Sequence, residues 1–420
     1  MLDEAHDDEQ IIERVAALDI GKAEVVCCVR VPGEGGRRRR QEVTSYSTMT
    51  RSLQVLADRL LELGVTRVVM EATSDYWKPP FYLLEACGLE PWLVNAKDVK
   101  HLPGRPKSDK LDAVWLCKVA ERQMVRPSFV PPPPIRRLRD LTRYRVDLVK
   151  ERTAEKQRVE KLLEDAQIKL SVVASDIFGV SGRQMMAALV TGERDPRVLA
   201  QMARGAMRGK IARLEEAFTG RFDEHHAFLL AKMLARVDRI DDDIAEIDIK
   251  IEEQISPFAD AVARLIEIPG VGLTAARTLI AEIGTDMSRF PTAGHLASWA
   301  RFAPVINESA GRSKSSKTGR GNRYLARTLG EIVVAGSRSN TFLGQRYRRL
   351  ARRRGKQKAI VAVGRSVLII VWHLLADPDT HFCDLGADFN DRRTSNSRRM
   401  RSHITGLEAL GYKVTLEPAA

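Results

Sequence analysis

Four carboxylates occupy positions in this chain that suit chemistry on a phosphate. Asp19 lies near the end of the apolar run Val15–Ile20, and Glu71 closes a later apolar run. Asp109 and Asp112 are three residues apart, which on a helix places both on one face with Cβ atoms roughly 5–6 Å apart. Four acids that converge would repel each other, and two divalent cations would relieve that repulsion. Mg²⁺ prefers oxygen ligands, and a pair of ions can clamp an in-line phosphoryl displacement.

Each acid also has an ordinary structural role open to it. Asp19 could cap the Gly21-Lys22 turn, and Asp109 could be a helix N-cap or a first-turn acid favoured by the helix dipole. Glu71 follows an apolar strand, where an acid needs a reason. As a set, the four are more specific than any single member. We therefore predict a catalytic, Mg²⁺-binding set that comprises Asp19, Glu71, Asp109 and Asp112.

The elements that would position these acids alternate between strand and helix patterns. Strands are predicted over residues 15–20, 24–31, 41–47, 67–71 and 89–95, and helices over 53–63, 76–87 and 109–122. The order is the order of a ribonuclease-H-like α/β domain, because doubly wound nucleotide-binding folds lack the opening three-strand meander. In such a sheet the first and fourth strands are neighbours, and the last helix can bring its first turn over them. We place this domain at residues 12–127.

Residues 128–255 are predicted to be a proline linker followed by long helices. Pro127 and the run 131–134 are stiff, and residues 136–164 are charged and helical. A heptad seam follows, formed by Leu230, Met233, Val237, Ile240, Ile244, Ile247 and Ile251. An intramolecular helical hairpin and a dimerising coiled coil explain this seam equally well.

A mainly helical third domain is predicted at residues 256–377. The run Ile268-Pro269-Gly270-Val271-Gly272 with Thr274 opening a helix has the form of a helix-hairpin-helix motif. The helix N-terminus would offer N–H groups to a phosphate, so such a motif holds a nucleic-acid backbone without reading its sequence. A dinucleotide-binding fingerprint is disfavoured because the preceding segment is predicted to be helical.

A loop over residues 307–322 mixes small hydroxyls with glycines and with the cations Arg312, Lys314, Lys317 and Arg320. It could be a flexible phosphate-contacting loop, or one serine could be a nucleophile toward a DNA phosphate. The loop contains no histidine, which argues against a Ser-His-acid hydrolase. A cation-rich helix follows, and we expect its Arg346, Arg349 and Arg353 to contact nucleic acid. Residues 378–420 are predicted to be a basic, flexible tail.

Composition sets wider bounds on the function. The chain has 420 residues, with 68 Lys and Arg against 55 Asp and Glu, for a formal net charge of +13. This excess favours a polyanionic partner, and 44% apolar residues argue against wholesale disorder. No run of 18 apolar residues occurs, so a membrane-spanning protein is not expected. The five cysteines show no ligand or disulfide spacing, and the acidic N-terminus does not fit a secretory signal. These features favour a reduced, cytoplasmic protein.

Five motifs in one order carry a family resemblance. They are Leu18-Asp19-Ile20-Gly21-Lys22, Met70-Glu71-Ala72-Thr73, Lys107-Ser108-Asp109-Lys110-Leu111-Asp112-Ala113, the glycine run at 268–272, and Lys317-Thr318-Gly319-Arg320-Gly321-Asn322-Arg323-Tyr324-Leu325. Over residues 12–377 the chain resembles the DEDD-type insertion-sequence transposases, bridge-RNA-guided serine-dependent DNA recombinases. The resemblance implies a Holliday-junction-resolvase-like domain whose four acids bind Mg²⁺, linked through a coiled coil to a transposase domain.

The resemblance also implies a nucleophile and partners. The family serine follows a glutamate in the pattern Glu-Ser-Gly, which points to Ser309 after Glu308, although Ala310 replaces the glycine here. Ser313, Ser315 and Ser316 therefore stay open as alternatives. The implied assembly is a dimer or tetramer with a composite site that holds two Mg²⁺ ions and is formed by the acids of one subunit and the serine of another. Its implied partners are donor DNA, target DNA and a noncoding bridge RNA, in the bacterial cytoplasm at the nucleoid.

Three functions follow from the sequence. The first is a transposase or recombinase in which Ser309 attacks a DNA phosphate. The second is a Mg²⁺-dependent endonuclease that resolves branched DNA by water attack, with the serine loop as a clamp. The third is a nucleic-acid-binding protein without catalysis. The presence of all four acids places the third last.

Overall fold

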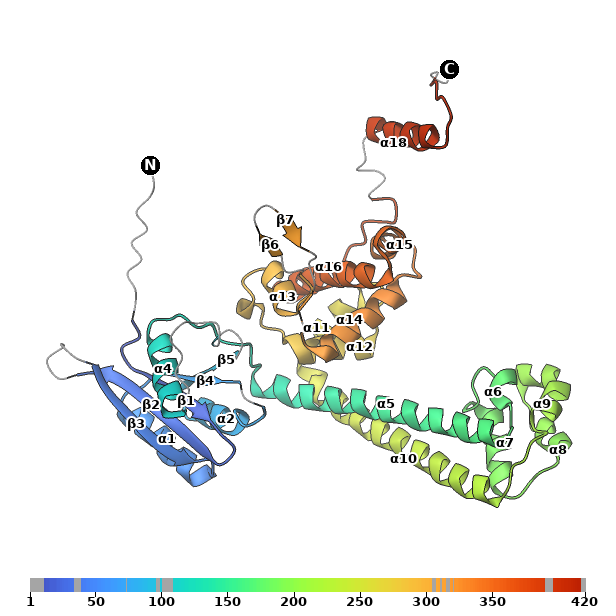
Figure 1. Cartoon of the computed structure of the whole chain (residues 1–420), viewed down its shortest axis with the longest axis horizontal. Helices are drawn as coiled ribbons and strands as arrows, with labels where there is room; N and C mark the ends of the chain where they lie inside the picture. The colour runs from blue at the N-terminus through green and yellow to red at the C-terminus, as the bar shows by residue number, and fades with distance from the viewer. Residues whose placement is uncertain are drawn as a thin grey trace. The chain divides into compact units, whose positions relative to one another are not determined.

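The computed structural model describes residues 11–33, 39–72, 74–95, 99, 109–303, 307–309, 312–314, 318–319, 321–389 and 396–416. The chain forms two compact units, Met1–Val130 and Pro131–Ala420. The first is built around a mixed sheet with helices, and the second is mostly helical (Figure 1). This division into an α/β part and a helical part confirms the predicted fold class at that level.

The sheet has five strands in the order β3-β2-β1-β4-β5. They are β1 (Val15–Ile20), β2 (Glu24–Pro32), β3 (Arg39–Ser47), β4 (Arg67–Glu71) and β5 (Glu90–Val94). β1, β2 and β3 form an antiparallel meander, whereas β4 pairs in parallel with both β1 and β5. The predicted strands are thus confirmed, because β-branched runs bounded by turn residues mark strands clearly.

Helices cover both faces of this sheet. They are α1 (Thr50–Glu62), α2 (Lys78–Ala86) and α4 (Asp109–Glu121). Successive strand residues point to opposite faces, so Leu18 and Met70 enter the buried cluster that contains Leu56 of α1. Ala17 and Val69 enter the opposite cluster, together with Leu116 of α4. The predicted helices are confirmed within two or three residues at each end.

A long antiparallel helical hairpin begins the second unit. It consists of α5 (Pro133–Asp165) and α10 (Glu224–Ile255), which lie side by side in Figure 1. Arg145 pairs with Asp248 at 2.5 Å, and Leu148 packs with Ile240 and Ile244. The heptad seam is therefore occupied by α5 of the same chain, which is the intramolecular alternative.

The proline linker is shorter than predicted. α5 starts at Pro133, so Pro133 and Pro134 belong to its first turn. Proline is tolerated there because the first N–H groups of a helix have no partner within the helix. The stiff proline run therefore continues directly into the hairpin of α5 and α10, which is called the arm below.

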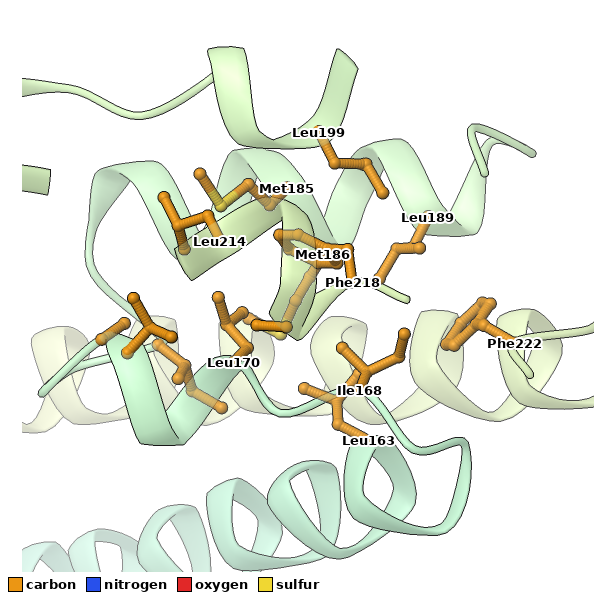
Figure 2. Close-up of a cluster of buried hydrophobic side chains, with 14 of the residues drawn as sticks. Leu163, Ile168, Leu170, Met185, Met186, Leu189, Leu199, Leu214, Phe218 and Phe222 are labelled. Carbon is orange, nitrogen blue, oxygen red and sulfur yellow. The ribbon is translucent and has the colours of Figure 1, made fainter. Parts of the chain in front are cut away.

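The far end of the hairpin is a small helical tip. It contains α6 (Leu170–Val173), α7 (Val180–Val190), α8 (Pro196–Gln201), the 3₁₀ helix η2 (Gly205–Lys210) and α9 (Ile211–Ala217). Figure 2 shows its core, in which Met185, Met186, Leu199 and Leu214 meet and are fully buried. Side chains from the ends of α5 and α10 complete the cluster, so the tip and the arm fold around shared contacts.

The remaining helices form a C-terminal globule around α16 (Lys356–Ala376). They are α11 (Ala259–Ile266), α12 (Leu273–Ile283), α13 (Ala293–Trp299), α14 (Arg323–Gly336) and α15 (Phe342–Arg354). A short hairpin of β6 (Asn307–Ser309) and β7 (Arg312–Lys314) precedes α14, and α18 (Asn396–Ala409) follows the globule in the chain.

Within the described ranges, α16 is the one helix long and apolar enough to cross a membrane, judged by length and composition. The sequence offered no such segment, because its uninterrupted apolar run is short. α16 packs against α11, α13, α14 and α15, which is the position of a core helix.

A backbone contact between two glycines joins the α11–α12 turn to α14. Gly270 has φ +93°, and a Cβ there would lie 2.4 Å from the Ile332 carbonyl oxygen. A Cβ on Gly336 would in turn lie 2.7 Å from the Pro269 carbonyl oxygen. Only glycine fits this left-handed conformation and close approach together.

We expect Gly270→Ala to lower the free energy of unfolding by about 2–4 kcal/mol, through backbone strain and the steric clash. Gly272→Ser is the matched control, because φ there is −93° and a Cβ would have no atom within 4 Å. The control should change stability by less than about 0.5 kcal/mol. Urea denaturation followed by circular dichroism measures both, and equal effects would contradict the contact.

Candidate functional site

Asp19 and Glu71 lie at the carboxyl ends of two neighbouring parallel strands. The register pairs Leu18 with Met70, so the next residues on the two strands are these two acids. Asp19 shares its strand face with Val15 and Ala17, and Glu71 shares its face with Val69. All three of these apolar residues belong to the cluster that α4 covers. The strand alternation therefore directs both acids to the α4 side of the sheet.

The direction of α4 places its first turn near the same edge. Cys117 Sγ donates to the Val15 carbonyl oxygen at 3.6 Å, and Ile12 N donates to the Glu121 carbonyl oxygen at 3.0 Å. The end of α4 thus lies at the beginning of β1, and the helix runs antiparallel to the strand. The eight residues from Cys117 back to Asp109 rise about 12 Å, and the four from Val15 to Asp19 rise about 13 Å. The start of α4 is therefore level with Asp19.

Helical periodicity directs Asp112 toward the same edge of the sheet. Ala113 and Leu116 are buried against the sheet, and Asp112 precedes Leu116 by one turn of the helix. Asp109 precedes Ala113 by one turn in the backbone, while its side chain lies outside the described residues. Positions i and i+4 share one helix face. Three of the predicted acids, and the backbone of the fourth, are thus directed toward the same edge of the sheet.

The chemistry of this edge suits a hard cation. Asp19, Glu71 and Asp112 are each half-buried, and each makes an interaction within the protein. They supply only oxygen donors, which Mg²⁺ prefers. Among the side chains that are described, no three His, Cys, Asp or Glu groups lie close enough to hold a metal. A metal site here would therefore need Asp109 or a rearrangement of the three.

Cys27 and Cys117 are poor metal ligands, whereas a hydrogen bond with Cys117 lowers the pKa of the Cys28 thiol. Cys27 and Cys117 are buried beside the sheet. Burial raises the pKa of the Cys27 thiol far above its ordinary value. A hydrogen bond with Cys28, together with burial, raises the pKa of Cys117. The thiolate, which is the form that binds metals, is thereby disfavoured.

The predicted nucleophile lies in the small hairpin of the second unit. Ser309 ends β6 and pairs in the backbone register with Arg312, while Glu308 pairs with Ser313. Lys314 ends β7, opposite Asn307. The side chains of both strands lie outside the described residues, as do Ser315, Ser316, Lys317 and Arg320. The hairpin nonetheless places Ser309 beside the turn, with an arginine at the paired position.

A buried polar cluster holds Asn322 at the end of the loop 307–322, and this cluster was not predicted from the sequence. Glu282 of α12 is fully buried and accepts two hydrogen bonds from Arg143 of α5, at 2.7 and 2.8 Å. Arg139 lies 3.4 Å from the same carboxylate and donates to the Ala281 and Glu282 carbonyl oxygens. Asn322 donates to Glu282 from the end of the loop. The visible hint was an acid inside the apolar end of α12.

Asn322 also starts the next helix. Its side-chain oxygen accepts from the backbone N–H groups of Tyr324 and Leu325, which caps α14. The Tyr324 hydroxyl donates to Asp147 of α5 at 3.0 Å, and a Cβ on Gly321 would lie 3.0 Å from the Ala300 carbonyl oxygen. The returning limb of the loop is thus fixed to three helices.

Glu282 affects the pKa of its partner Arg143. Burial lowers the pKa of the Arg143 guanidinium, but the hydrogen bond and charge of Glu282 outweigh it, so the pKa is raised above its ordinary value. Arg143 therefore remains charged beside the buried carboxylate, as a buried ion pair requires.

The arginines of the basic helix α15 have two kinds of role. Some form hydrogen bonds within the protein, and others lie on its surface. Arg348 donates to the Ser337 and Ser339 carbonyl oxygens at 2.8 and 3.1 Å. Burial and the neighbouring charge of Arg349 lower the pKa of Arg346, and Arg353 is exposed in the last turn. Arg346, Arg349 and Arg353 share one face by spacing. Two cations that repel each other favour an anion between them.

The predicted phosphate-binding turn is partly used inside the protein. Gly270 packs against α14, as described above, whereas Gly272, Leu273 and Thr274 are exposed. The helical α11 before the turn confirms that this is not a strand-borne dinucleotide fingerprint. The first N–H groups of α12 consequently remain accessible for an anion.

Two family models match this chain. A model of DEDD-type IS110 proteins, described as "Transposase", matches residues 16–168. A model described as "Transposase IS116/IS110/IS902 family" matches residues 262–348. Together the matches span more than half of the chain, and they include the four acids, Glu282, Ser309 and Asn322.

Three curated relatives show weaker overall similarity. The transposase for insertion sequence element IS1111A of Coxiella burnetii is 24% identical over 333 residues, which is 76% of this chain and 80% of the relative. The uncharacterized 44.8 kDa protein of insertion element IS116 of Streptomyces clavuligerus is 25% identical over 322 residues, 70% of this chain and 78% of the relative. The uncharacterized 43.6 kDa protein of IS110 of Streptomyces coelicolor is 30% identical over 132 residues, covering 30% and 32%.

The Glu282 cluster yields a stability prediction. Glu282→Gln should lower the free energy of unfolding by about 3–5 kcal/mol, because it leaves Arg139 and Arg143 partly buried without a counter-charge. Glu331→Gln is the control, since that carboxylate is 63% exposed and pairs only with Arg327 in its own helix. It should change stability by at most about 0.5 kcal/mol. Thermal and urea unfolding measure both, and indistinguishable variants would refute the role of Glu282.

Proposed function

Because this chain belongs to the IS110 family of insertion-sequence transposases, we propose that it is a serine-dependent DNA recombinase that cuts and rejoins strands for mobile-element insertion and excision. The observation that carries the proposal is the meeting of Asp19, Glu71 and the start of α4 at one sheet edge. Acids gathered at strand ends are suited to phosphoryl transfer with metal ions.

The N-terminal unit would then be a ribonuclease-H-like domain. Its strand order, with a meander followed by two parallel strands, supports this assignment. Asp19, Glu71, Asp109 and Asp112 would hold Mg²⁺, with two ions per composite site. Bound there, Mg²⁺ supplies Lewis-acid polarisation of the scissile phosphate. The residues themselves orient the ions, and the half-buried setting of the acids limits competing water.

Ser309 would be the nucleophile in this proposal. Its Oγ forms a bond to the phosphorus atom while the ester bond to the leaving deoxyribose oxygen breaks. The proton lost by the serine is balanced by the proton that the leaving oxygen takes up. Arg312, paired with Ser309 in the hairpin register, is suited to stabilise charge on the phosphate. Ser313, Ser315 and Ser316 remain the alternative nucleophiles.

The acids and the serine belong to different compact units. The family resemblance implies a composite site in which one subunit contributes the acids and another the hydroxyl, within a dimer or tetramer, and we include this assembly in the proposal. A bridge RNA that pairs with donor and target DNA would then choose the sites, because the chain itself offers mostly backbone-binding features.

Those backbone contacts would come from the second unit. The turn residues Gly272 and Thr274 present the N-terminus of α12, assigned here as a helix-hairpin-helix motif. The remaining candidates are cations of the loop and of α15: Arg312, Lys314, Lys317, Arg320, Arg346, Arg349 and Arg353. Gly270 would act indirectly, by setting the turn against α14.

The covalent step gives a direct test. With a nicked suicide DNA substrate, guide RNA and Mg²⁺, the wild-type chain should form a protein–DNA adduct that survives denaturing electrophoresis. Ser309→Ala should abolish the adduct because the attacking hydroxyl is gone, while Ser313→Ala should retain it. An adduct with Ser309→Ala would remove that assignment, and cleavage without any adduct would favour the nuclease that uses water.

The metal site is tested by neutralising its acids. Asp19→Asn should reduce strand cleavage and exchange about 100-fold or more, the loss typical of removing one group that stabilises transition-state charge. Asp109→Asn should behave likewise while sparing RNA binding. Asp75→Asn is the control, because Asp75 is 80% exposed and pairs with Lys78, and it should keep near-normal rates. Recombination by Asp19→Asn at the control rate would exclude Asp19 from the site.

A further inference from the structure

The tip of the helical arm carries a run of cations between two pairs of acids, Glu193 and Asp195 before it and Glu215 and Glu216 after it. Residues 196–214 contain Arg197, Arg204, Arg208, Lys210 and Arg213 and no Asp or Glu. The four arginines are exposed, and none of the ion pairs found among the described residues includes Arg204, Arg208 or Arg213. These three, together with Arg197 and Lys210, are called the tip patch below. α9 packs against both α8 and η2, so the segments that carry the tip patch are neighbours in space.

The tip patch is mounted on a packed core. Leu199 of α8 and Leu214 of α9 are fully buried with Met185 and Met186 (Figure 2). The backbone N–H of Arg204 donates to Ser181 Oγ at 3.0 Å. Because these contacts fix the segments between the arginines, the cations form a positioned surface rather than a flexible tail.

Two glycines lie in the tip patch. The backbone conformation explains Gly205, whereas nothing in the folded chain requires a glycine at Gly209. Gly205 has φ +54°, a conformation that favours glycine. Gly209, between Arg208 and Lys210, lacks a positive φ, and a Cβ there would meet no atom within 4 Å. A missing side chain in open space between two cations lets a ligand approach the backbone closely.

The arm separates this patch from the basic helix of the globule. α5 rises about 33 Å over the 22 residues from Arg143, at the Glu282 cluster, to its end at Asp165. α5 carries ten basic and seven acidic residues and α10 carries four basic and nine acidic residues, so the two helices together bear a net charge of −2. The shaft therefore offers no excess of positive charge that would lead a nucleic-acid segment from the globule to the tip.

We propose that the arm tip is a second nucleic-acid-binding surface, which takes the phosphodiester backbone of a segment other than the one bound at the C-terminal globule. Exposed arginines on a fixed platform bind phosphates without reading bases, and Gly209 marks the closest approach. This proposal shares its class of partner, a nucleic acid, with the proposed function. It does not depend on the catalytic mechanism.

The test compares two triple variants of the full chain without Mg²⁺. Arg204→Ala, Arg208→Ala and Arg213→Ala together remove three charges from the tip. Lys232→Ala, Arg239→Ala and Lys250→Ala remove three charges from α10 and serve as the control. Affinity for a labelled duplex DNA and for a labelled structured RNA is measured across salt concentrations, with circular dichroism confirming the fold of both variants.

For the nucleic acid that occupies the tip, the tip variant should lose about three from the slope of log affinity against log salt, close to one per phosphate contact. The control should match the wild type. The DNA and RNA arms identify which source supplies the backbone. Slopes and affinities of the tip variant equal to those of the control on both nucleic acids would overturn the proposal.

Gly209→Ala tests the close approach by itself. An added Cβ meets nothing in the free protein, so the melting temperature should be unchanged or raised, while affinity for the tip ligand should fall several-fold. Unchanged affinity would overturn the close approach at this position. Adduct formation by Ser309 is measured separately, so failure of the covalent mechanism would leave these slopes untouched, and failure of the tip would leave the adduct untouched.

Discussion

One buried carboxylate organises the second unit of this protein. Glu282 is fully buried, and burying a charge is costly unless it is paired and hydrogen-bonded. Arg139 and Arg143 of α5 and Asn322 at the start of α14 meet that requirement together. The same contacts that neutralise the charge also join the arm to the globule and fix the end of the serine loop. An energetic demand of one side chain thus determines how three distant segments are held.

In the first unit, strand alternation has a similar consequence. Ala17 and Val69 are buried against α4. Asp19 and Glu71 lie two residues further along the same strands and so point to the same face, which means that packing of the sheet directs the acids to the α4 side. The antiparallel course of α4 then brings its first turn to their level. The edge that we propose for metal-assisted phosphoryl transfer is therefore a by-product of how the core is filled. The proposed serine and the proposed tip patch lie in the other unit. We propose that all three features bind a phosphate.

Several parts of this arrangement could be predicted from the sequence. The strands that carry Asp19 and Glu71 are continuous β-branched runs between turn residues, and both acids stand at the visible ends of those runs. Asp109 and Asp112 were predicted at a helix start from their spacing. The roles of Glu282 and Asn322 could not be predicted, because their partners Arg139 and Arg143 lie far away in the sequence. The tip could not be predicted either, since its own helices are short and its buried core is shared among six helices and the segments between them.

Local pattern by itself determined the element types of the first unit, the edge position of its acids, the heptad seam and the basic character of the chain. These follow from side-chain periodicity and charge, which act over a few residues. Only the tertiary structure decided that the seam of α10 is covered by α5, that Gly270 packs on α14, and that Glu282 is paired. Each of these depends on which surfaces meet after the chain closes long loops, and a buried group finds its partner by proximity in space rather than in sequence.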